Sequence, residues 1–111
     1  PYTTLFRSAL TVTDDGSLGE TGLVTGPAAR LLRENRYGLI CACGPTPMLK
    51  AISALAEQSG VPCLVSLEER MACGMGACLC CAAKLRVNDK DAYVHVCKAG
   101  PVFDSKKVVF E

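Results

Sequence analysis

Residues 73–81 read Cys73-Gly74-Met75-Gly76-Ala77-Cys78-Leu79-Cys80-Cys81, and a further cysteine follows at Cys97. Taken as Cys73, Cys78, Cys81 and Cys97, these cysteines have the spacing C-x4-C-x2-C…C. That spacing is the plant-type signature of the ligands to a [2Fe–2S] cluster. This stretch limits the possible folds and functions of the chain more than any other, because the fold must bring four thiolates to one centre.

The residues between the first two cysteines suit a loop that wraps around a cluster. Backbone N–H groups must point at the sulfurs, because hydrogen bonds there help to set the reduction potential. Gly74, Gly76 and Ala77 let the main chain come close, and glycine also tolerates positive φ. The sequence therefore predicts an iron–sulfur loop, whose common use is the transfer of single electrons.

Zinc and disulfides are the two other uses of these cysteines. Structural zinc sites usually pair two short C-x2-4-C knuckles, whereas the second half here supplies only Cys97. Eight cysteines in 111 residues are dense enough for a disulfide framework. However, no signal peptide precedes them, and the four within residues 73–81 could hardly all pair well. The spacing favours iron over both alternatives.

The remaining cysteines leave one ambiguity. Cys80 and Cys81 are neighbours, and proximity alone lets either be the third ligand; the x2 gap favours Cys81. Cys80 is then a small apolar filler or a nearby thiol. Cys41 and Cys63 lie in apolar runs, so we expect both to be buried in the core.

Composition excludes several classes of function. The formal net charge is +1, with Lys and Arg scattered along the chain, which argues against a basic nucleic-acid surface. No apolar run approaches the length of a membrane helix. A thiol-rich chain without an export signal predicts the reducing cytoplasm. Residues 1–8 resemble the translation of a sequencing-library adapter, so we exclude them from the fold and expect the natural chain to be longer upstream.

The first half of the chain alternates between strand-like and helix-like patterns. Apolar periodicity predicts strands over 9–13, 37–43 and 61–67, with helices over 24–35 and 47–58. Thr46 is placed to cap the second helix with Pro47 at its first position, and Gly60 is placed to end it. This β-α-β-α-β order predicts an α/β fold with an open parallel sheet over residues 9–69.

The second part, residues 70–111, has a different pattern. Short alternating strands are predicted over 82–87 and 93–96, joined by a hairpin loop from Asn88 to Asp91, and 106–110 could add an edge strand. We therefore expect a small, mostly antiparallel β domain that holds the cluster. The predicted domain boundary lies near Glu69 to Cys73.

Two blocks carry a resemblance to a known family. Residues 66–78 read Ser66-Leu67-Glu68-Glu69-Arg70-Met71-Ala72-Cys73-Gly74-Met75-Gly76-Ala77-Cys78, and residues 96–103 read Val96-Cys97-Lys98-Ala99-Gly100-Pro101-Val102-Phe103. These blocks resemble the electron-transfer subunit of class 1B dihydroorotate dehydrogenase. Upstream, the segment 13–25, with Asp14 and Asp15, and the element Cys43-Gly44-Pro45 resemble the nucleotide half of the ferredoxin-reductase superfamily.

The resemblance implies a fold. Subunits of this family consist of a flavin-binding β-barrel, a parallel-sheet NAD domain and a C-terminal [2Fe–2S] domain. By this resemblance, the chain corresponds to part of the NAD domain followed by the cluster domain, without the barrel. We therefore expect it to be an oxidoreductase subunit that is inactive alone, with FAD present in the full-length protein. One departure is Cys80, where the family pattern would place Gly.

The resemblance also implies an electron path in pyrimidine biosynthesis. Dihydroorotate would reduce FMN on a partner catalytic subunit, the cluster would relay single electrons to FAD, and FAD would pass a hydride to NAD⁺. The cluster ligands would be the four cysteines of the plant-type spacing. Cys43, Gly44 and Pro45 would lie near the nicotinamide and the flavin, and Asp14 and Asp15 would bind nucleotide ribose hydroxyls.

Plainer interpretations stand beside these. Asp14-Asp15-Gly16 is equally a simple turn, and Cys43 is equally a buried thiol at the end of a strand. His95 is predicted to be structural or at the surface, and a single histidine excludes a Rieske centre. The alternatives for function are a related iron–sulfur reductase subunit that serves another dehydrogenase, and a zinc-binding interaction module.

Overall fold

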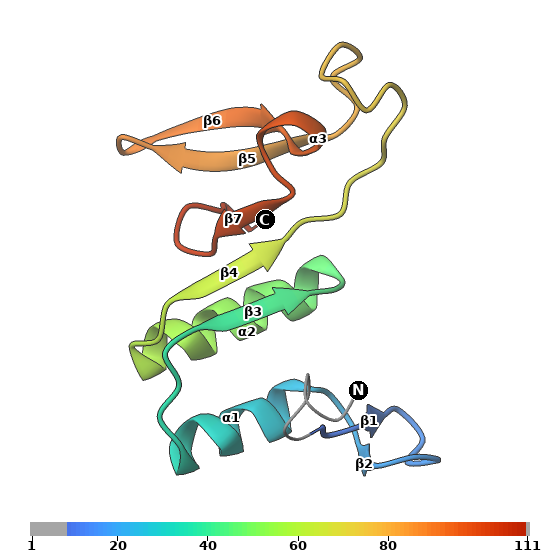
Figure 1. Ribbon diagram of the computed structural model, residues 1–111, viewed down its shortest axis with the longest axis vertical. Helices are drawn as coiled ribbons and strands as arrows, with labels where there is room; N and C mark the ends of the chain where they lie inside the picture. The colour runs from blue at the N-terminus through green and yellow to red at the C-terminus, as the bar shows by residue number, and fades with distance from the viewer. Residues whose placement is uncertain (1–8, 111) are drawn as a thin grey trace, which may run out of the picture. The chain divides into compact units, whose positions relative to one another are not determined.

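The computed structural model describes residues 9–110, so the predicted adapter-like segment 1–8 lies outside the described residues (Figure 1). The chain divides into two compact units, Pro1–Asn35 and Arg36–Glu111, and each is described by itself. The coarse expectation of a mixed α/β fold is confirmed. The predicted boundary near Glu69 to Cys73 stays a prediction.

The described part of the first unit is small. Strand β1, Val12–Thr13, pairs in parallel with β2, Glu20–Thr21, and helix α1 spans Thr25–Glu34. The predicted strand over 9–13 is thus reduced to its last two residues, whereas the predicted helix over 24–35 is confirmed to within one residue at each end. The guanidinium of Arg30 in α1 forms a 2.8 Å ion pair with the carboxylate of Glu20 in β2.

The second unit is built on a three-stranded sheet in the order β3-β4-β7 (Figure 1). Strands β3, Ile40–Cys43, and β4, Cys63–Ser66, are parallel, as predicted, and helix α2, Thr46–Ser59, connects them. Both strands are shorter than the predicted 37–43 and 61–67. The ladder starts where the N–H of Ile40 reaches the carbonyl of Pro62, which has no N–H of its own to extend the pairing.

Strand β7, Val102–Asp104, was not predicted. It pairs antiparallel with β4, with Val65 opposite Phe103. This pairing joins residues on either side of the predicted boundary in one sheet, so a short segment near the C-terminus is held by the parallel pair. Three residues are too few to show a strand period in the sequence.

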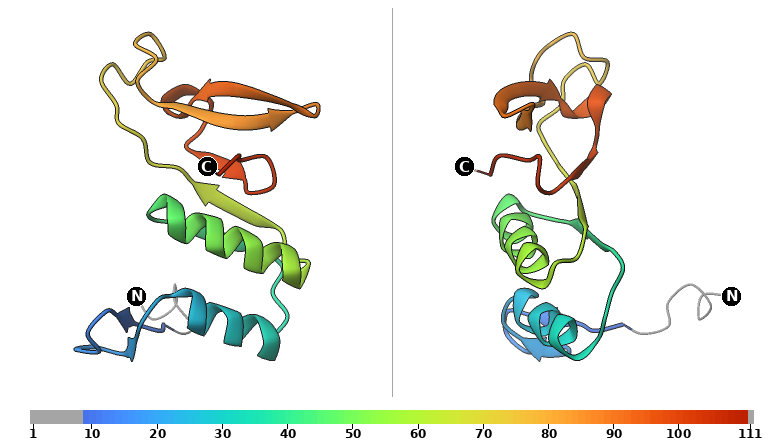
Figure 2. Two further views of the ribbon diagram at one scale, coloured as in Figure 1. Left: turned by 180° about the vertical axis from the view of Figure 1, so that it is seen from behind. Right: turned by 90° about the vertical axis from the view of Figure 1, so that its left-hand side faces the viewer.

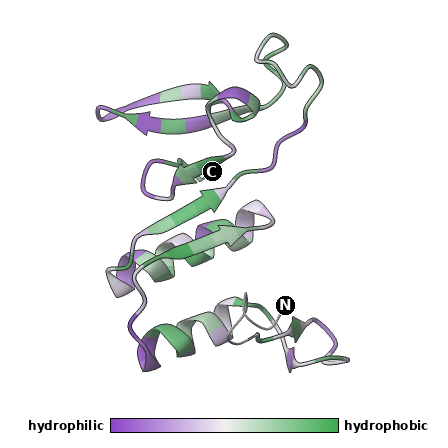
Figure 3. Ribbon diagram, viewed as in Figure 1, coloured by the Kyte–Doolittle hydropathy of each residue, from purple (hydrophilic) through white to green (hydrophobic). Residues whose placement is uncertain are grey.

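Helix α2 packs against β3 and β4, and this contact contributes much of the core. Leu49, Ile52 and Ala56 from one face of α2 are buried together with Cys63 and Val65 of β4. Figure 3 shows that β3 and β4 are largely hydrophobic along their length. Buried apolar side chains at helical spacing explain why the prediction of this helix succeeded.

The two ends of α2 test two predictions about capping. The prediction that Thr46 caps the helix is wrong: the helix already includes Thr46, Pro45 occupies the cap position, and no side chain caps it. The prediction for Gly60 is confirmed, because Gly60 adopts a left-handed conformation with φ 69° and its N–H reaches the carbonyls of Ala56 and Glu57.

Strands β5, Ala82–Val87, and β6, Lys90–His95, form an antiparallel hairpin. β5 has the predicted bounds, but β6 starts earlier than the predicted 93–96. Asn88 and Asp89 both have positive φ, 51° and 62°, so a two-residue turn lets pairing begin at once with Val87 opposite Lys90. Helix α3, Val96–Ala99, follows directly. The predicted edge strand over 106–110 is reduced to a single antiparallel bridge between Leu85 of β5 and Val108, with backbone hydrogen bonds from Arg86 to Lys107 and from Val109 to Lys84.

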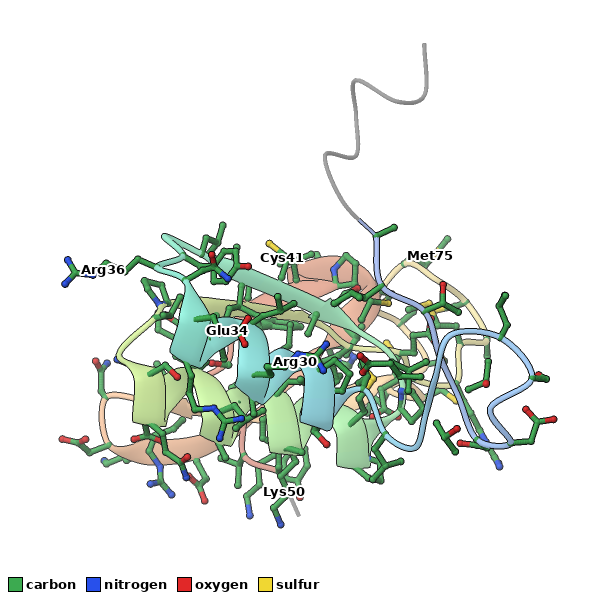
Figure 4. The ribbon with its side chains drawn as sticks, turned by 90° about the horizontal axis from the view of Figure 1, so that it is seen from below. Arg30, Glu34, Arg36, Cys41, Lys50 and Met75 are labelled. Atoms are coloured by element: carbon green, nitrogen blue, oxygen red, sulfur yellow. The ribbon has the colours of Figure 1, made fainter. Side chains whose placement is uncertain are left out.

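The expectation that Cys41 and Cys63 are both buried is half right. Cys63 is 4% exposed, on the face of β4 that α2 covers. Cys41 is exposed, and Figure 4 shows its sulfur pointing away from β3. Because side chains alternate along a strand, Ile40 and Ala42 take the half-buried face, and Cys41 and Cys43 take the opposite one.

Candidate metal centre

The cysteine segment is a long loop between β4 and β5. Residues 67–81 form neither helix nor strand, and Figure 2 shows this loop extending away from the strands that it joins. Gly74, Gly76 and Leu79 have positive φ of 69°, 87° and 64°. These three left-handed positions curl the backbone, so that its N–H groups turn toward the cysteine side chains.

The first two cysteines form a pair. The Sγ atom of Cys73 accepts hydrogen bonds from the N–H groups of Met75 at 3.4 Å and Ala77 at 3.3 Å. The N–H and the thiol of Cys78 also donate to this sulfur. These donors, with the N–H of Met75 first, lower the pKa of the Cys73 thiol to about 6. A thiolate is thus favoured at Cys73, and a thiolate is the form that binds a metal.

The last two cysteines form a second pair. The N–H of Cys97 donates to the Sγ of Cys81 at 3.5 Å, and the N–H of Val96 donates to the carbonyl of Cys81 at 3.0 Å. The N–H of Cys97, followed by its thiol, lowers the pKa of Cys81. The same thiol contact raises the pKa of Cys97, because Cys97 keeps its proton to donate it. The start of α3 therefore holds this pair.

The two pairs are connected through the loop. The N–H of Gly76, which lies between Cys73 and Cys78, donates to the sulfur of Cys97, and Cys97 also interacts electrostatically with Cys73. The described contacts thus hold Cys73 with Cys78 and Cys81 with Cys97. The N–H of Gly76 is the contact that connects the loop of the first pair to the sulfur of Cys97.

Cys80 and Cys81 differ clearly. Cys81 is 3% exposed and takes part in the contacts with Cys97, whereas Cys80 is exposed. Within residues 9–110, none of the hydrogen bonds of the two pairs involves Cys80. The x2 gap and the burial therefore favour the same residue as third ligand.

The four thiols do not surround a single point. Within residues 9–110, no three His, Cys, Asp or Glu side chains lie close enough to hold one metal ion. The arrangement of two pairs fits a [2Fe–2S] cluster, in which two protein ligands serve each iron, better than it fits one tetrahedral zinc ion. The chemistry of the donor set, four thiols with N–H groups on their sulfurs, also fits an iron–sulfur cluster.

The candidate nucleotide residues lie in both compact units. Asp14 and Asp15 are exposed in the turn between β1 and β2, where the carboxylate of Asp15 accepts the N–H of Ser17 at 3.0 Å and its pKa is lowered by that bond. Cys43, at the end of β3, is exposed rather than buried, and it pairs with Ser66 at the carboxyl edge of the parallel strands. Gly44 and Pro45 follow at the start of α2.

Sequence reasoning missed three features of the loop's surroundings: helix α3, the positive φ of Leu79, and the side chain of Lys98, which lies over Gly76. The place of Gly76 between the two candidate ligands Cys73 and Cys78 was a sequence signal that another group comes close to position 76. No pattern marked the other two. His95 precedes α3, and its buried Nδ1 has no hydrogen-bond partner within residues 9–110.

Comparisons with known proteins agree with this site. Residues 68–109 match the family described as the iron–sulfur cluster binding domain of dihydroorotate dehydrogenase B. A dihydroorotate dehydrogenase B (NAD(+)) electron transfer subunit from Caldanaerobacter subterraneus subsp. tengcongensis is 45% identical over 98 residues, 88% of this chain. One from Desulforamulus reducens is 44% identical over 99 residues, 89% of this chain. The chain belongs to the family of dihydroorotate dehydrogenase B electron-transfer subunits. It spans 39% and 38% of the length of these two relatives.

A solved structure is also similar. It is described as the NADH-dependent reduced ferredoxin-NADP oxidoreductase, studied for flavin-based electron bifurcation. The match has a TM-score of 0.74 at 34% identity and covers 91% of this chain and 35% of that one. The family expectation of a ferredoxin-reductase-like fold is confirmed at this coarse level. Within residues 9–110, no helix is long and apolar enough to cross a bilayer.

Proposed function

We propose that Cys73, Cys78, Cys81 and Cys97 bind a [2Fe–2S] cluster and that the chain relays electrons as part of a dihydroorotate dehydrogenase B electron-transfer subunit. The observation that carries the proposal is the division of these four thiols into two pairs, Cys73 with Cys78 and Cys81 with Cys97, in which one sulfur of each pair accepts backbone N–H groups. Each pair would bind one iron, Cys73 with Cys78 and Cys81 with Cys97.

The residues of the loop each have a task in this proposal. A bound cluster supplies one-electron transfer between flavins that also handle electron pairs. The N–H groups of Met75 and Ala77 stabilise negative charge on Cys73, as the N–H of Cys97 does on Cys81. Burial of Cys81 keeps water from that side of the centre, which favours retention of the metal.

The nucleotide part of the proposal is supported by the position of Cys43, Gly44 and Pro45. They follow a parallel strand at its carboxyl end, the edge at which open α/β sheets bind ligands. We propose that this edge lies near FAD and NAD in the complete subunit, with Asp14 and Asp15 on ribose hydroxyls. The partner would be the FMN-containing catalytic subunit that oxidises dihydroorotate, and the compartment would be the cytoplasm, where free thiols persist.

Anaerobic reconstitution with iron and sulfide tests the proposal. The wild-type chain should bind two irons and two sulfides and absorb visible light, because a [2Fe–2S] centre is coloured and zinc is not. Equimolar zinc offered in competition should not displace the cluster. A colourless chain that retains one zinc would instead support a zinc-binding module and contradict the proposal.

The similar solved structure favours a second candidate within the same class. Its description names a reduced ferredoxin-NADP oxidoreductase rather than a dihydroorotate dehydrogenase. A chain of this fold could therefore serve a different dehydrogenase. Mixing the reconstituted chain with a dihydroorotate dehydrogenase catalytic subunit and dihydroorotate separates the two: bleaching of the cluster supports the first candidate, and an unchanged spectrum supports the second.

A further inference from the structure

The side chain of Lys98 lies across the loop that would hold the cluster. A methyl group placed on Gly76 would lie 3.1 Å from Cδ, 3.6 Å from Cβ and 3.9 Å from Cγ of Lys98. The alkyl stem of Lys98 therefore occupies the space that a side chain at position 76 would take. Gly76 also has φ 87°, a conformation that favours glycine, and a side chain at this position would have to displace the stem of Lys98.

Two consecutive residues of α3 thus hold the same point of the loop. Cys97 accepts the N–H of Gly76 at its sulfur, and Lys98 covers the α-carbon of Gly76. A long lysine stem can cover apolar surface while its charged end stays in water. This arrangement keeps the N–H of Gly76 directed at Cys97, and it places the ammonium on the rim of the cysteine loop.

The charge of Lys98 is not neutralised by a neighbour. Within residues 9–110, no carboxylate pairs with its ammonium, and the residue is exposed. Two ferric ions, two sulfides and four thiolates together form a dianion, and one added electron makes a trianion. A fixed positive charge nearby stabilises the more negative form more strongly, and so it favours reduction.

We propose that Lys98 is a positioning residue for the cluster: its stem holds Gly76 against Cys97, and its ammonium raises the reduction potential. The inference rests on the proposed function, because it needs a cluster at the four cysteines. The electron comes from a chemical reductant, dithionite, and it converts one ferric ion to the ferrous state without breaking a bond to a cysteine.

The charge is tested by measuring the midpoint potential of the reconstituted chain in a dithionite titration. Lys98→Met keeps most of the stem and removes the charge, so it should lower the midpoint potential at low salt, and the difference from wild type should shrink at high salt. Lys98→Arg should restore the wild-type potential. A purely structural role would not produce this salt-dependent shift or its rescue.

Lys90→Met is the matched control. Lys90 is an exposed lysine at the start of β6, and Lys98 lies beyond the other end of that strand. The five residue steps from Lys90 to His95 span roughly 17 Å, so the charge of Lys90 lies much farther from the cysteine loop than the charge of Lys98. The midpoint potential of Lys90→Met should therefore shift much less than that of Lys98→Met at low salt, and it should match wild type at 0.1 M salt, where the screening length is about 10 Å. An unchanged potential in Lys98→Met at low salt would overturn the inference while leaving the proposed function intact.

The packing role has a readout that needs no cluster. In the metal-free chain, Lys98→Ala should speed amide hydrogen exchange at Gly76, whereas Lys98→Met should leave it slow because most of the stem is kept. Equal exchange in all three proteins would overturn the packing role. The two possible failures can be told apart. If the wild-type chain binds iron and sulfide but the Lys98 variants behave like it, the inference about Lys98 fails and the proposed function stands. If the wild-type chain binds no cluster, the proposed function itself fails.

Discussion

The N–H of Cys97 lies 3.5 Å from the Sγ of Cys81 and donates a hydrogen bond to it. This bond ties the first turn of α3 to the residue just before β5, so the hairpin brings the two ends of the site together. β5 and β6 pair over their whole length, from Ala82 opposite His95 to Val87 opposite Lys90. The hairpin register, rather than the loop alone, therefore sets the separation of Cys81 and Cys97.

The contrast between Cys80 and Cys81 gives the first prediction. Cys81→Ser should abolish or strongly reduce cluster binding, because it removes the sulfur that the N–H of Cys97 contacts. Cys80→Ser should bind iron and sulfide as wild type does, since Cys80 is exposed and outside the paired contacts. Iron and sulfide content after anaerobic reconstitution measures both. Loss of the cluster in Cys80→Ser with retention in Cys81→Ser would reverse the ligand assignment.

The parts of the fold that the sequence predicted share a physical cause. Helix α2 and strand β5 carry enough residues to show a period, and their buried faces follow that period: Leu49, Ile52 and Ala56 in α2, Ala83 and Leu85 in β5. The elements that were missed are short and are held by partners distant in sequence. Strand β7 forms because it pairs with the free edge of β4. A segment of three residues carries no sequence pattern from which this pairing could be predicted.

The site divides in a similar way. Cysteine spacing alone selects Cys73, Cys78, Cys81 and Cys97 as the proposed ligands, because ligand spacing reflects the geometry of a cluster. It could not show that Cys41 would be exposed, since burial depends on which face of β3 the helix covers. It also could not show which N–H groups reach the sulfurs, because these depend on backbone angles along the loop.

The second prediction concerns Leu79, which has φ 64° although it is not glycine. A left-handed conformation costs an L-residue roughly 1–2 kcal/mol. Leu79 is 65% exposed, so Leu79→Gly loses little burial and should leave the free energy of unfolding unchanged or raise it. Leu79→Val should lower it by about 1 kcal/mol or more, because β-branched residues tolerate positive φ poorly. Chemical denaturation of the metal-free chain measures both.

Leu79→Met is the control for that series. It keeps an unbranched side chain of similar volume and the same backbone requirement, so its stability should match wild type. If Leu79→Val were as stable as Leu79→Met, position 79 would not impose a left-handed backbone in solution.

The third prediction concerns the turn between β5 and β6. Asn88 and Asp89 have φ of 51° and 62°, which fits a two-residue turn of the type that prefers Asn-Gly. Asp89→Gly should therefore stabilise the hairpin by up to about 1 kcal/mol, because it removes the steric cost of positive φ. Asp89→Val should destabilise it. Denaturation midpoints of the two variants measure the effect, and a more stable Asp89→Val would contradict the turn geometry.

The fourth prediction is a pH dependence at Asp91 in β6. A hydrogen bond from the Arg86 guanidinium at 3.1 Å is the main cause that lowers the pKa of Asp91 below 3.8, and the charges of Arg86 and Lys84 add to it. A carboxyl whose pKa is lower in the folded state stabilises that state above its unfolded pKa, and this contribution is lost as the pH falls through the folded pKa.

Arg86→Met should therefore raise the pKa of Asp91 toward 3.8. An NMR titration of the Asp91 carboxyl at low salt measures this shift. Arg33→Met removes an arginine from α1 instead, so the pKa of Asp91 should stay at its wild-type value, and an equal shift in both variants would show that general charge rather than the Arg86 contact sets it.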